Sequence, residues 1–254
     1  MTGHLAVMAY PLLIARIAGA LLVSTCLALA FATYALLLRR NRHASAFGRF
    51  GLRALRRLFG MRIATVGKPL RLSPGGHLVV VNHRTGLDVI ALDALLDLRV
   101  LAHAGVGRWP LVGRMARAAG TIFVDRGAGG SRAAALRSIA AALTAGQAVL
   151  VFPEGTTYAG DEVRRFSSGV FAAARGHFVL PVGMAVTPGA EFTEDSFAAH
   201  LWRLLRERTT VFTFAIGEPY ECPEIPEDAA PDARQRVEAL VHQARRAFED
   251  PREA

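Results

Sequence analysis

The sequence has few of the residues and patterns that several common kinds of site require. Its 254 residues include only two cysteines, Cys26 and Cys222, which lie far apart, so we expect no disulfide framework and a reducing compartment. There is no Gly-x-Ser-x-Gly elbow of a serine hydrolase, no Gly-x-x-x-x-Gly-Lys-Ser/Thr phosphate loop and no spacing of zinc ligands. We therefore expect neither a metal nor a bound cofactor.

Acidic residues are missing from the first quarter of the chain. Residues 1–66 contain nine arginines and no aspartate or glutamate, which accounts for the whole formal net charge of +9. A protein that binds nucleic acid more often carries its basic surface on the folded domain. Here the positive charge flanks an apolar segment, which indicates an anionic membrane surface, and no nucleic acid, as the partner.

The longest uncharged apolar stretch covers residues 17–38. As a helix its 22 residues would span about 33 Å, enough to cross the hydrocarbon core of a bilayer. Arginines follow at positions 39, 40 and 42, so the positive-inside rule places the rest of the chain on the cytoplasmic side of the inner membrane. A cleaved signal peptide is disfavoured, because such a peptide carries its positive charge before its apolar core. A re-entrant hairpin, broken at Pro11 and Gly19, remains open.

A second N-terminal segment has the pattern of a basic amphipathic helix. Apolar residues recur at three- and four-residue spacing from Phe47 to Leu58, and arginines 49, 53, 56 and 57 fall on the opposite face. Such a helix suits the headgroup layer of a membrane, but its apolar face could also pack on the folded domain, and both can hold. We therefore predict a membrane anchor in residues 1–60, followed by a folded domain in residues 61–254.

From residue 61 onward, strand patterns alternate with helix patterns. The predicted strands cover residues 63–66, 78–81, 100–103, 122–124, 148–152, 178–186 and 211–216, and the predicted helices cover residues 89–98, 110–119, 131–144 and 231–248. This alternation is typical of an α/β fold with a mostly parallel sheet flanked by helices. Functional residues of such sheets gather at the carboxyl ends of the strands.

His83 follows the carboxyl end of the predicted strand 78–81, and Asp88 lies in the first turn of the helix after it. The short loop between them can fold back so that the carboxylate meets the imidazole. A histidine that acts as a general base needs this partner, because the carboxylate fixes the tautomer and stabilises the imidazolium. A hydrogen-bonded histidine and a helix-dipole carboxylate without chemical roles would give the same local pattern, so the pair alone leaves both interpretations open.

Further motifs follow His83 along the chain. They are Gly120-Thr121-Ile122-Phe123-Val124-Asp125-Arg126, Phe152-Pro153-Glu154-Gly155-Thr156-Thr157 and Leu180-Pro181-Val182. With Asn82-His83-Arg84-Thr85-Gly86-Leu87-Asp88 before them, they have an order and spacing that resembles the lysophospholipid acyltransferase family, in particular the bacterial 1-acyl-sn-glycerol-3-phosphate acyltransferases. The resemblance covers roughly residues 60–220.

The resemblance implies direct acyl transfer to a lysolipid at a membrane surface. In that case His83 is the general base and Asp88 holds it. The acceptor's glycerol phosphate would be bound by four residues of the later motifs, Arg126, Glu154, Gly155 and Thr156. The acyl donor would be acyl-CoA or acyl-carrier protein, which is a co-substrate.

Two departures from the family pattern concern the acceptor. Members that form phosphatidic acid usually have arginine where this chain has Thr157 and lysine where it has Ser167, although Arg164 and Arg165 are near enough to substitute. The Pro-Glu-Gly-Thr-Thr variant is similar to that of members that acylate lyso-ornithine lipid, which has no phosphate. Of these acceptors we expect 1-acylglycerol-3-phosphate. A non-catalytic membrane lipid-binding protein is a further alternative, which the intact histidine–aspartate pair disfavours.

Overall fold

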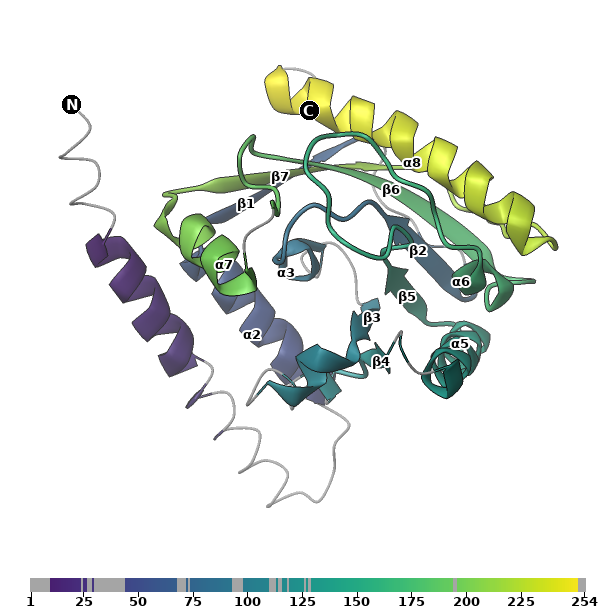
Figure 1. Cartoon of the computed structure of the whole chain (residues 1–254), viewed down its shortest axis with the longest axis horizontal. Helices are drawn as coiled ribbons and strands as arrows, with labels where there is room; N and C mark the ends of the chain where they lie inside the picture. The colour runs from purple at the N-terminus through teal and green to yellow at the C-terminus, as the bar shows by residue number, and fades with distance from the viewer. Residues whose placement is uncertain are drawn as a thin grey trace.

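The computed structural model describes residues 10–23, 25–26, 29, 44–67, 72, 74–92, 98–109, 113, 116–117, 119–125, 127, 129–193 and 196–250. In this part of the chain, eight strands form one sheet (Figure 1): β1 (Met61–Val66), β2 (His77–Val81), β3 (Leu98–His103), β4 (Ile122–Val124), β5 (Ala148–Val151), β6 (Phe178–Val186), β7 (Thr210–Ile216) and β8 (Tyr220–Glu221). Their order is β1-β7-β6-β2-β5-β3-β4, with β8 beside β6. Only β6 with β7 and β6 with β8 pair antiparallel, so the predicted α/β fold with a mostly parallel sheet is confirmed.

Helices cover both faces of the sheet (Figure 1). One face is covered by α5 (Gly129–Thr144), α6 (Gly169–Ala172) and α8 (Pro226–Glu249), and the other by α2 (Ala44–Leu58), α3 (Asp88–Leu92) and α7 (Phe197–Arg206). A short 3-10 helix, η1 (Ala104–Arg108), follows β3.

Strand β2 lies at the centre of this arrangement. Leu78 and Val80 enter the core beneath α5 and α8, whereas Val79 and Val81 enter the core on the opposite face. Because β2 is buried on both faces, its residues 78–81 form an unbroken apolar run and do not alternate with polar residues.

Several helix boundaries differ from the predicted ones. Helix α8 begins at Pro226 and not at Pro231, because a proline at the first helical position with Glu227 and Asp228 in the first turn makes a favourable start. Helices α6 and α7 were not predicted. The helix predicted over residues 89–98 is described only as α3, and the one predicted over residues 110–119 lies largely outside the described residues.

The predicted membrane-crossing helix over residues 17–38 is not supported. Among the described residues, no helix is both long enough and apolar enough to cross a bilayer, and residues 24, 27–28 and 30–38 of the predicted span lie outside them. The described helical residues from position 10 onward include Arg16, which is buried. Its guanidinium donates to the backbone oxygens of Leu205 at 2.9 Å, Arg208 at 2.8 Å and Glu207. Arg16 therefore ties this segment to the end of α7.

The predicted amphipathic helix is present as α2. Its Leu55 and Leu58 pack against the core, while Arg53 and Arg57 are exposed, so its apolar face contacts the folded domain. Leu13 of the N-terminal segment is also part of this core. The division into residues 1–60 and 61–254 stays a prediction, but residues on both sides of it share one core.

Gly183 on β6 determines how closely α8 approaches the sheet. A Cβ atom at this position would lie 2.2 Å from the Leu240 carbonyl carbon and 2.3 Å from the Val241 nitrogen, both in the backbone of α8.

We predict that Gly183→Ala costs about 1–3 kcal/mol of folding free energy because it forces the helix away. The melting temperature should fall by about 2–4 °C for each kcal/mol. Gly130→Ala is the matched control, since its Cβ would meet open space in α5. Equal melting temperatures for the two variants would contradict this account of the packing.

Candidate active site

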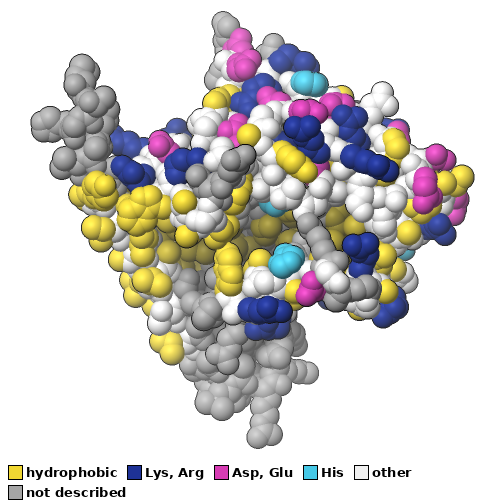
Figure 2. All heavy atoms as spheres, in the orientation of Figure 1, with side chains coloured by type: hydrophobic (Ala, Val, Ile, Leu, Met, Phe, Trp, Pro, Cys, Tyr) yellow, Lys and Arg dark blue, Asp and Glu magenta, His cyan; other side chains and the backbone are white. Residues whose placement is uncertain are grey.

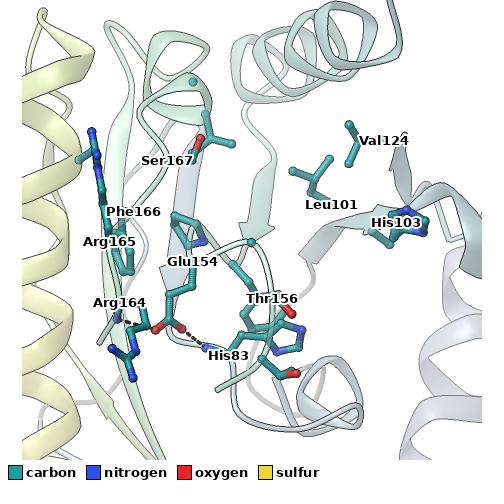
Figure 3. A pocket seen from close by; sticks show the side chains of 18 of the residues that line it. His83, Leu101, His103, Val124, Glu154, Thr156, Arg164, Arg165, Phe166 and Ser167 are labelled. Carbon is teal, nitrogen blue, oxygen red and sulfur yellow. Dashed lines mark hydrogen bonds between the residues drawn. The ribbon is translucent and has the colours of Figure 1, made fainter. Parts of the chain in front are cut away.

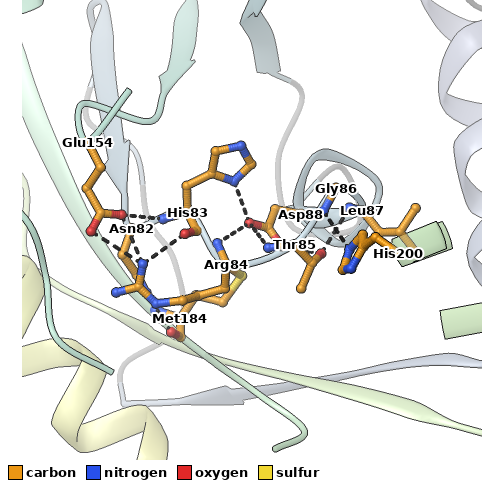
Figure 4. Close-up of polar contacts among 10 residues, drawn as sticks. All are labelled: Asn82, His83, Arg84, Thr85, Gly86, Leu87, Asp88, Glu154, Met184 and His200. Atoms are coloured by element: carbon orange, nitrogen blue, oxygen red, sulfur yellow. Dashed lines mark hydrogen bonds and ion pairs between the residues drawn. The ribbon is translucent and has the colours of Figure 1, made fainter. Parts of the chain in front are cut away.

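The loop after β2 carries the predicted catalytic pair, and the structure brings the two side chains together (Figure 4). His83 Nδ1 lies 2.7 Å from Asp88 Oδ2, and Asp88 is the first residue of α3. The Asp88 side chain is fully buried, whereas 23% of the His83 side chain is exposed. A carboxylate accepts, so Nδ1 carries the proton of this bond and Nε2 is left as the basic nitrogen.

Further contacts fix the orientation of both members of the pair. The Asp88 carboxylate also accepts from the backbone N–H groups of Arg84 at 2.7 Å and Thr85 at 3.0 Å, and from Thr85 Oγ1 at 2.6 Å. The His83 ring stacks on Phe152, with 4.1 Å between ring centroids and 16° between planes. The carboxylate thus has a fixed direction, and it holds an imidazole whose plane is fixed as well.

Asn82 fixes the point where the loop leaves the sheet. Its Nδ2 donates to the Met184 carbonyl oxygen and its Oδ1 accepts from the Met184 N–H, both at 2.8 Å. The side-chain amide therefore extends the pairing of β2 with β6 by one more step after β2 has ended.

Glu154, predicted to contact the acceptor, is buried behind the loop (Figures 3 and 4). Its Oε2 accepts from the His83 N–H at 2.6 Å and from Arg84 Nη1 at 3.1 Å. Its Oε1 accepts from the Arg164 N–H at 2.8 Å. These protein donors use both carboxylate oxygens, so the geometry favours a role in positioning the His83 loop over direct contact with an acceptor.

Arg84 is a residue of this site to which we assigned no role from the sequence. It is 1% exposed, and besides its ion pair with Glu154 it donates to the carbonyl oxygens of His83 and Glu162, both at 2.8 Å. A buried ion pair of this kind is costly to break, by about 3–5 kcal/mol, because the remaining charge has no partner. The sequence does contain a pattern that could have indicated this pair: an arginine and a glutamate each follow a buried strand. A parallel sheet places the ends of two such strands at the same edge.

Two of the remaining predicted binding residues, Gly155 and Thr156, lie in the turn after β5. Gly155 has a φ of +84° and its N–H donates to the Phe152 carbonyl oxygen at 3.0 Å, so a residue without Cβ is needed in this turn. Thr156 is exposed at the wall of a cavity. Arg126 lies outside the described residues, so its role in binding the acceptor stays a prediction.

A cavity of about 1490 Å³ opens beside His83 (Figure 3). Figure 2 shows the surface hollowed near its centre, with hydrophobic side chains in the recess. One part of the wall is apolar and includes Leu101, Val124, Leu136, Ile139 and Val170. The apolar wall suits an acyl chain.

Charged side chains also line the cavity. They are the arginines Arg132, Arg164, Arg165 and Arg234 and the glutamates Glu154, Glu162 and Glu227. The arginines suit an anionic headgroup. Among the described residues, no group of three or more His, Cys, Asp or Glu side chains gathers as a metal site would require.

Comparisons with known proteins agree with this geometry. The acyltransferase family model matches residues 63–188. A lyso-ornithine lipid O-acyltransferase of Brucella abortus is 32% identical over 250 residues, which cover 89% of this chain and 92% of that protein. The chain belongs to the acyltransferase family. The resemblance inferred from the four motifs, and the prediction of an O-acyltransferase, are confirmed.

Other acyltransferases with different names are also similar. A lyso-ornithine lipid O-acyltransferase of Pseudomonas aeruginosa is 37% identical over 172 residues, covering 64% of this chain and 66% of that protein. A 1-acyl-sn-glycerol-3-phosphate acyltransferase of Neisseria gonorrhoeae is 30% identical over 175 residues, covering 65% of this chain and 67% of that protein. The crystal structure of the 1-acyl-sn-glycerophosphate acyltransferase PlsC from Thermotoga maritima matches 92% of this chain and 97% of that one, with a TM-score of 0.64 and 18% identity, and so shows the same fold.

The paired geometry of His83 and Asp88 predicts that both are needed for acyl transfer. His83→Ala and Asp88→Asn should each lower the rate by about 10²–10⁴-fold, because the attacking hydroxyl loses its base or the base loses its partner. Turnover of a labelled acyl thioester measures the effect, and circular dichroism verifies the fold. The control is His242→Ala, a histidine exposed on α8. Near-normal turnover by well-folded His83→Ala protein would reject the assignment.

Proposed function

We propose that this acyltransferase transfers a fatty acyl group from acyl-CoA or acyl-carrier protein to the free hydroxyl of a lysolipid, with His83 as general base. The observation that carries the proposal is the 2.7 Å contact between His83 Nδ1 and the buried Asp88, which leaves Nε2 as the basic nitrogen of a side chain that lines the cavity. Nothing in this chemistry requires a metal or a bound cofactor.

In the proposed mechanism, His83 Nε2 takes the proton of the acceptor hydroxyl while the oxygen attacks the carbonyl carbon of the thioester. The carbon–sulfur bond then breaks, and the leaving thiolate receives the proton from the imidazolium. The products are the acylated lipid and the free thiol of the donor. Asp88 stabilises the imidazolium between the two proton transfers. Base assistance contributes about 10²–10⁴-fold, and holding both reactants in line contributes further.

We propose lyso-ornithine lipid as the acceptor, in place of the 1-acylglycerol-3-phosphate that the sequence analysis favoured. The absence of arginine at Thr157 and of lysine at Ser167 supports this choice, because a phosphate would lack two usual partners. The relative from Brucella abortus, which matches most of the chain, is named for this acceptor. An ornithine headgroup carries both a carboxylate and an ammonium group. Glu162 and Arg164 form an ion pair at 3.1 Å in the cavity wall, so both kinds of partner are present there.

The second candidate acceptor is 1-acylglycerol-3-phosphate. It is supported by the relative from Neisseria gonorrhoeae and by the arginines in the cavity wall, of which Arg164 and Arg165 follow the Glu154 motif. With this acceptor, the predicted contact of Arg126 with the phosphate would carry much of the charge compensation. Arg126→Ala would then cost about 10–150-fold in kcat/KM, the value of one charge-assisted hydrogen bond.

Acceptor choice is tested with purified protein, a labelled acyl thioester and the two lysolipids in parallel. We predict acylation of lyso-ornithine lipid. Thr157→Arg should lower this activity and raise activity on 1-acylglycerol-3-phosphate, because the new cation meets a phosphate only in the second acceptor. Thr157→Val, which adds no charge, is the matched control and should change neither. Activity on 1-acylglycerol-3-phosphate with none on lyso-ornithine lipid would overturn the choice of acceptor and leave acyl transfer in place.

We further propose that the protein lies on the cytoplasmic surface of the inner membrane through its N-terminal segment. Ile14, Ile17, Leu21 and Leu22 recur on one face of that helix and are 37–65% exposed. Hydrophobic side chains gather along this edge of the molecule in Figure 2. Phe50 on α2 is also exposed, at 66%. A helix with one face on the domain and the other in the lipid headgroup layer accounts for this pattern.

Membrane attachment is tested by changing only this exposed face. We predict that the triple variant Ile17→Ser, Leu21→Ser and Leu22→Ser no longer floats with lipid vesicles. The unchanged protein should stay bound at high salt, because salt screens arginines but leaves inserted apolar side chains in place. Ile225→Ser removes an exposed apolar side chain before α8 and serves as the control. Release of the unchanged protein by salt alone would show that its attachment is electrostatic.

A further inference from the structure

Helix α7 contacts the catalytic loop through a buried histidine that the mechanism does not use. The Gly86 N–H donates to His200 Nε2 at 3.1 Å (Figure 4), and His200 is 0% exposed. A backbone N–H can only donate, so Nε2 of His200 must be the unprotonated nitrogen of a neutral ring. The ring packs against Phe192, with 4.7 Å between the two ring centroids, and this contact limits its orientation.

The loop approaches α7 closely because residue 86 has no side chain. A Cβ atom on Gly86 would lie 2.4 Å from Cε2 of Phe197 and 3.4 Å from Cδ2 of His200. The Phe197 ring is itself packed against Trp109, with 4.9 Å between centroids. The glycine therefore permits the hydrogen bond to His200.

Every backbone N–H from His83 to Leu87 has a partner. Asp88 accepts from Arg84 and Thr85, Glu154 accepts from His83, and Thr85 Oγ1 accepts from Leu87. The remaining one, on Gly86, is satisfied by a side chain 114 residues later in the chain. Of these acceptors, His200 alone belongs to the connection between β6 and β7, so its bond ties the loop to a part of the fold that the two carboxylates do not reach.

We infer that His200 is a positioning residue of the acyl-transfer reaction, which holds the loop from His83 to Asp88 against α7 so that His83 Nε2 stays directed at the acceptor hydroxyl. The inference rests on the proposed role of His83 as general base. His200 does not exchange a proton with substrate. It acts through the Gly86 backbone, and its contribution is the direction of the His83–Asp88 pair.

The test compares three proteins in the acyl-transfer assay. His200→Leu removes the acceptor of the Gly86 hydrogen bond at similar volume, and kcat should fall by about 10–100-fold, because a small displacement of a catalytic group has costs of this size. KM for the acceptor should change little, since the cavity wall is kept. His200→Gln places an amide oxygen near the former Nε2 and should recover most of the lost kcat.

A control and a direct readout separate positioning from general destabilisation. His77→Leu removes another buried histidine, at the opposite end of β2, and should lower the melting temperature without lowering kcat. Hydrogen exchange of the Gly86 amide should be fast in His200→Leu and slow in the unchanged protein and in His200→Gln. Unchanged kcat in His200→Leu, or a loss that His200→Gln does not recover, would overturn the inference.

A second variant covers the case in which His200→Leu does not fold. Gly86→Ala should lower kcat in the same way, because its Cβ pushes the loop away from Phe197. Gly86→Ala combined with Phe197→Ala should restore part of the rate by removing the clash. No restoration would count against the proposed contact. If the unchanged protein acylates no lysolipid, the proposed function fails. If the unchanged protein acylates a lysolipid and His200→Leu has the same kcat, only the positioning role of His200 fails.

Discussion

Strand β2 is buried on both faces, and the loop that follows it begins inside the protein, where backbone polar groups have no bulk water to bind. An unpaired buried N–H costs about 1–3 kcal/mol, so each one in this loop needs a partner within the protein. Asp88, Glu154, Thr85 and His200 supply those partners. The position of His83 is a consequence of this requirement, since the same bonds that satisfy the loop also fix the direction of its side chains.

The two buried carboxylates have different tasks that follow from their different partners. Asp88 contacts the His83 ring, so its negative charge would stabilise the imidazolium of the proposed mechanism. Glu154 contacts the His83 backbone and the Arg84 guanidinium, so its charge is balanced by a cation away from the ring. Fixed charges that need no rearrangement during the reaction are an effective way to stabilise a developing charge. The Arg84–Glu154 pair supplies the rigidity on which this depends.

Local features were predictable from the sequence, and contacts between distant residues were not. The strands and the His83–Asp88 pair were found because an apolar run, a turn and a helix start lie within a dozen residues. The Arg84–Glu154 and Gly86–His200 contacts join residues 70 and 114 positions apart, and no local pattern reports them. The predicted membrane-crossing helix is not supported among the described residues, and hydropathy counts apolar residues without regard to their direction. Leu13 and Arg16 face the domain, whereas Ile14 and Leu21 face outward, so one apolar segment serves two surfaces.

The residues proposed to select the acceptor and the residues that hold His83 differ in burial, and so in the strength of their electrostatic interactions. The residues that hold His83 are buried, and their interactions are strong because water is excluded. The Glu162–Arg164 pair in the cavity wall is about half exposed, with 63% and 49% of the two side chains accessible, and exposed pairs contribute at most about 1 kcal/mol. With the proposed function, substitutions at Thr157 or Ser167 would therefore change the preferred headgroup and leave the loop from His83 to Asp88 undisturbed. Such a separation would account for the similarity of one chain both to acyltransferases named for a phosphate-bearing acceptor and to those named for lyso-ornithine lipid.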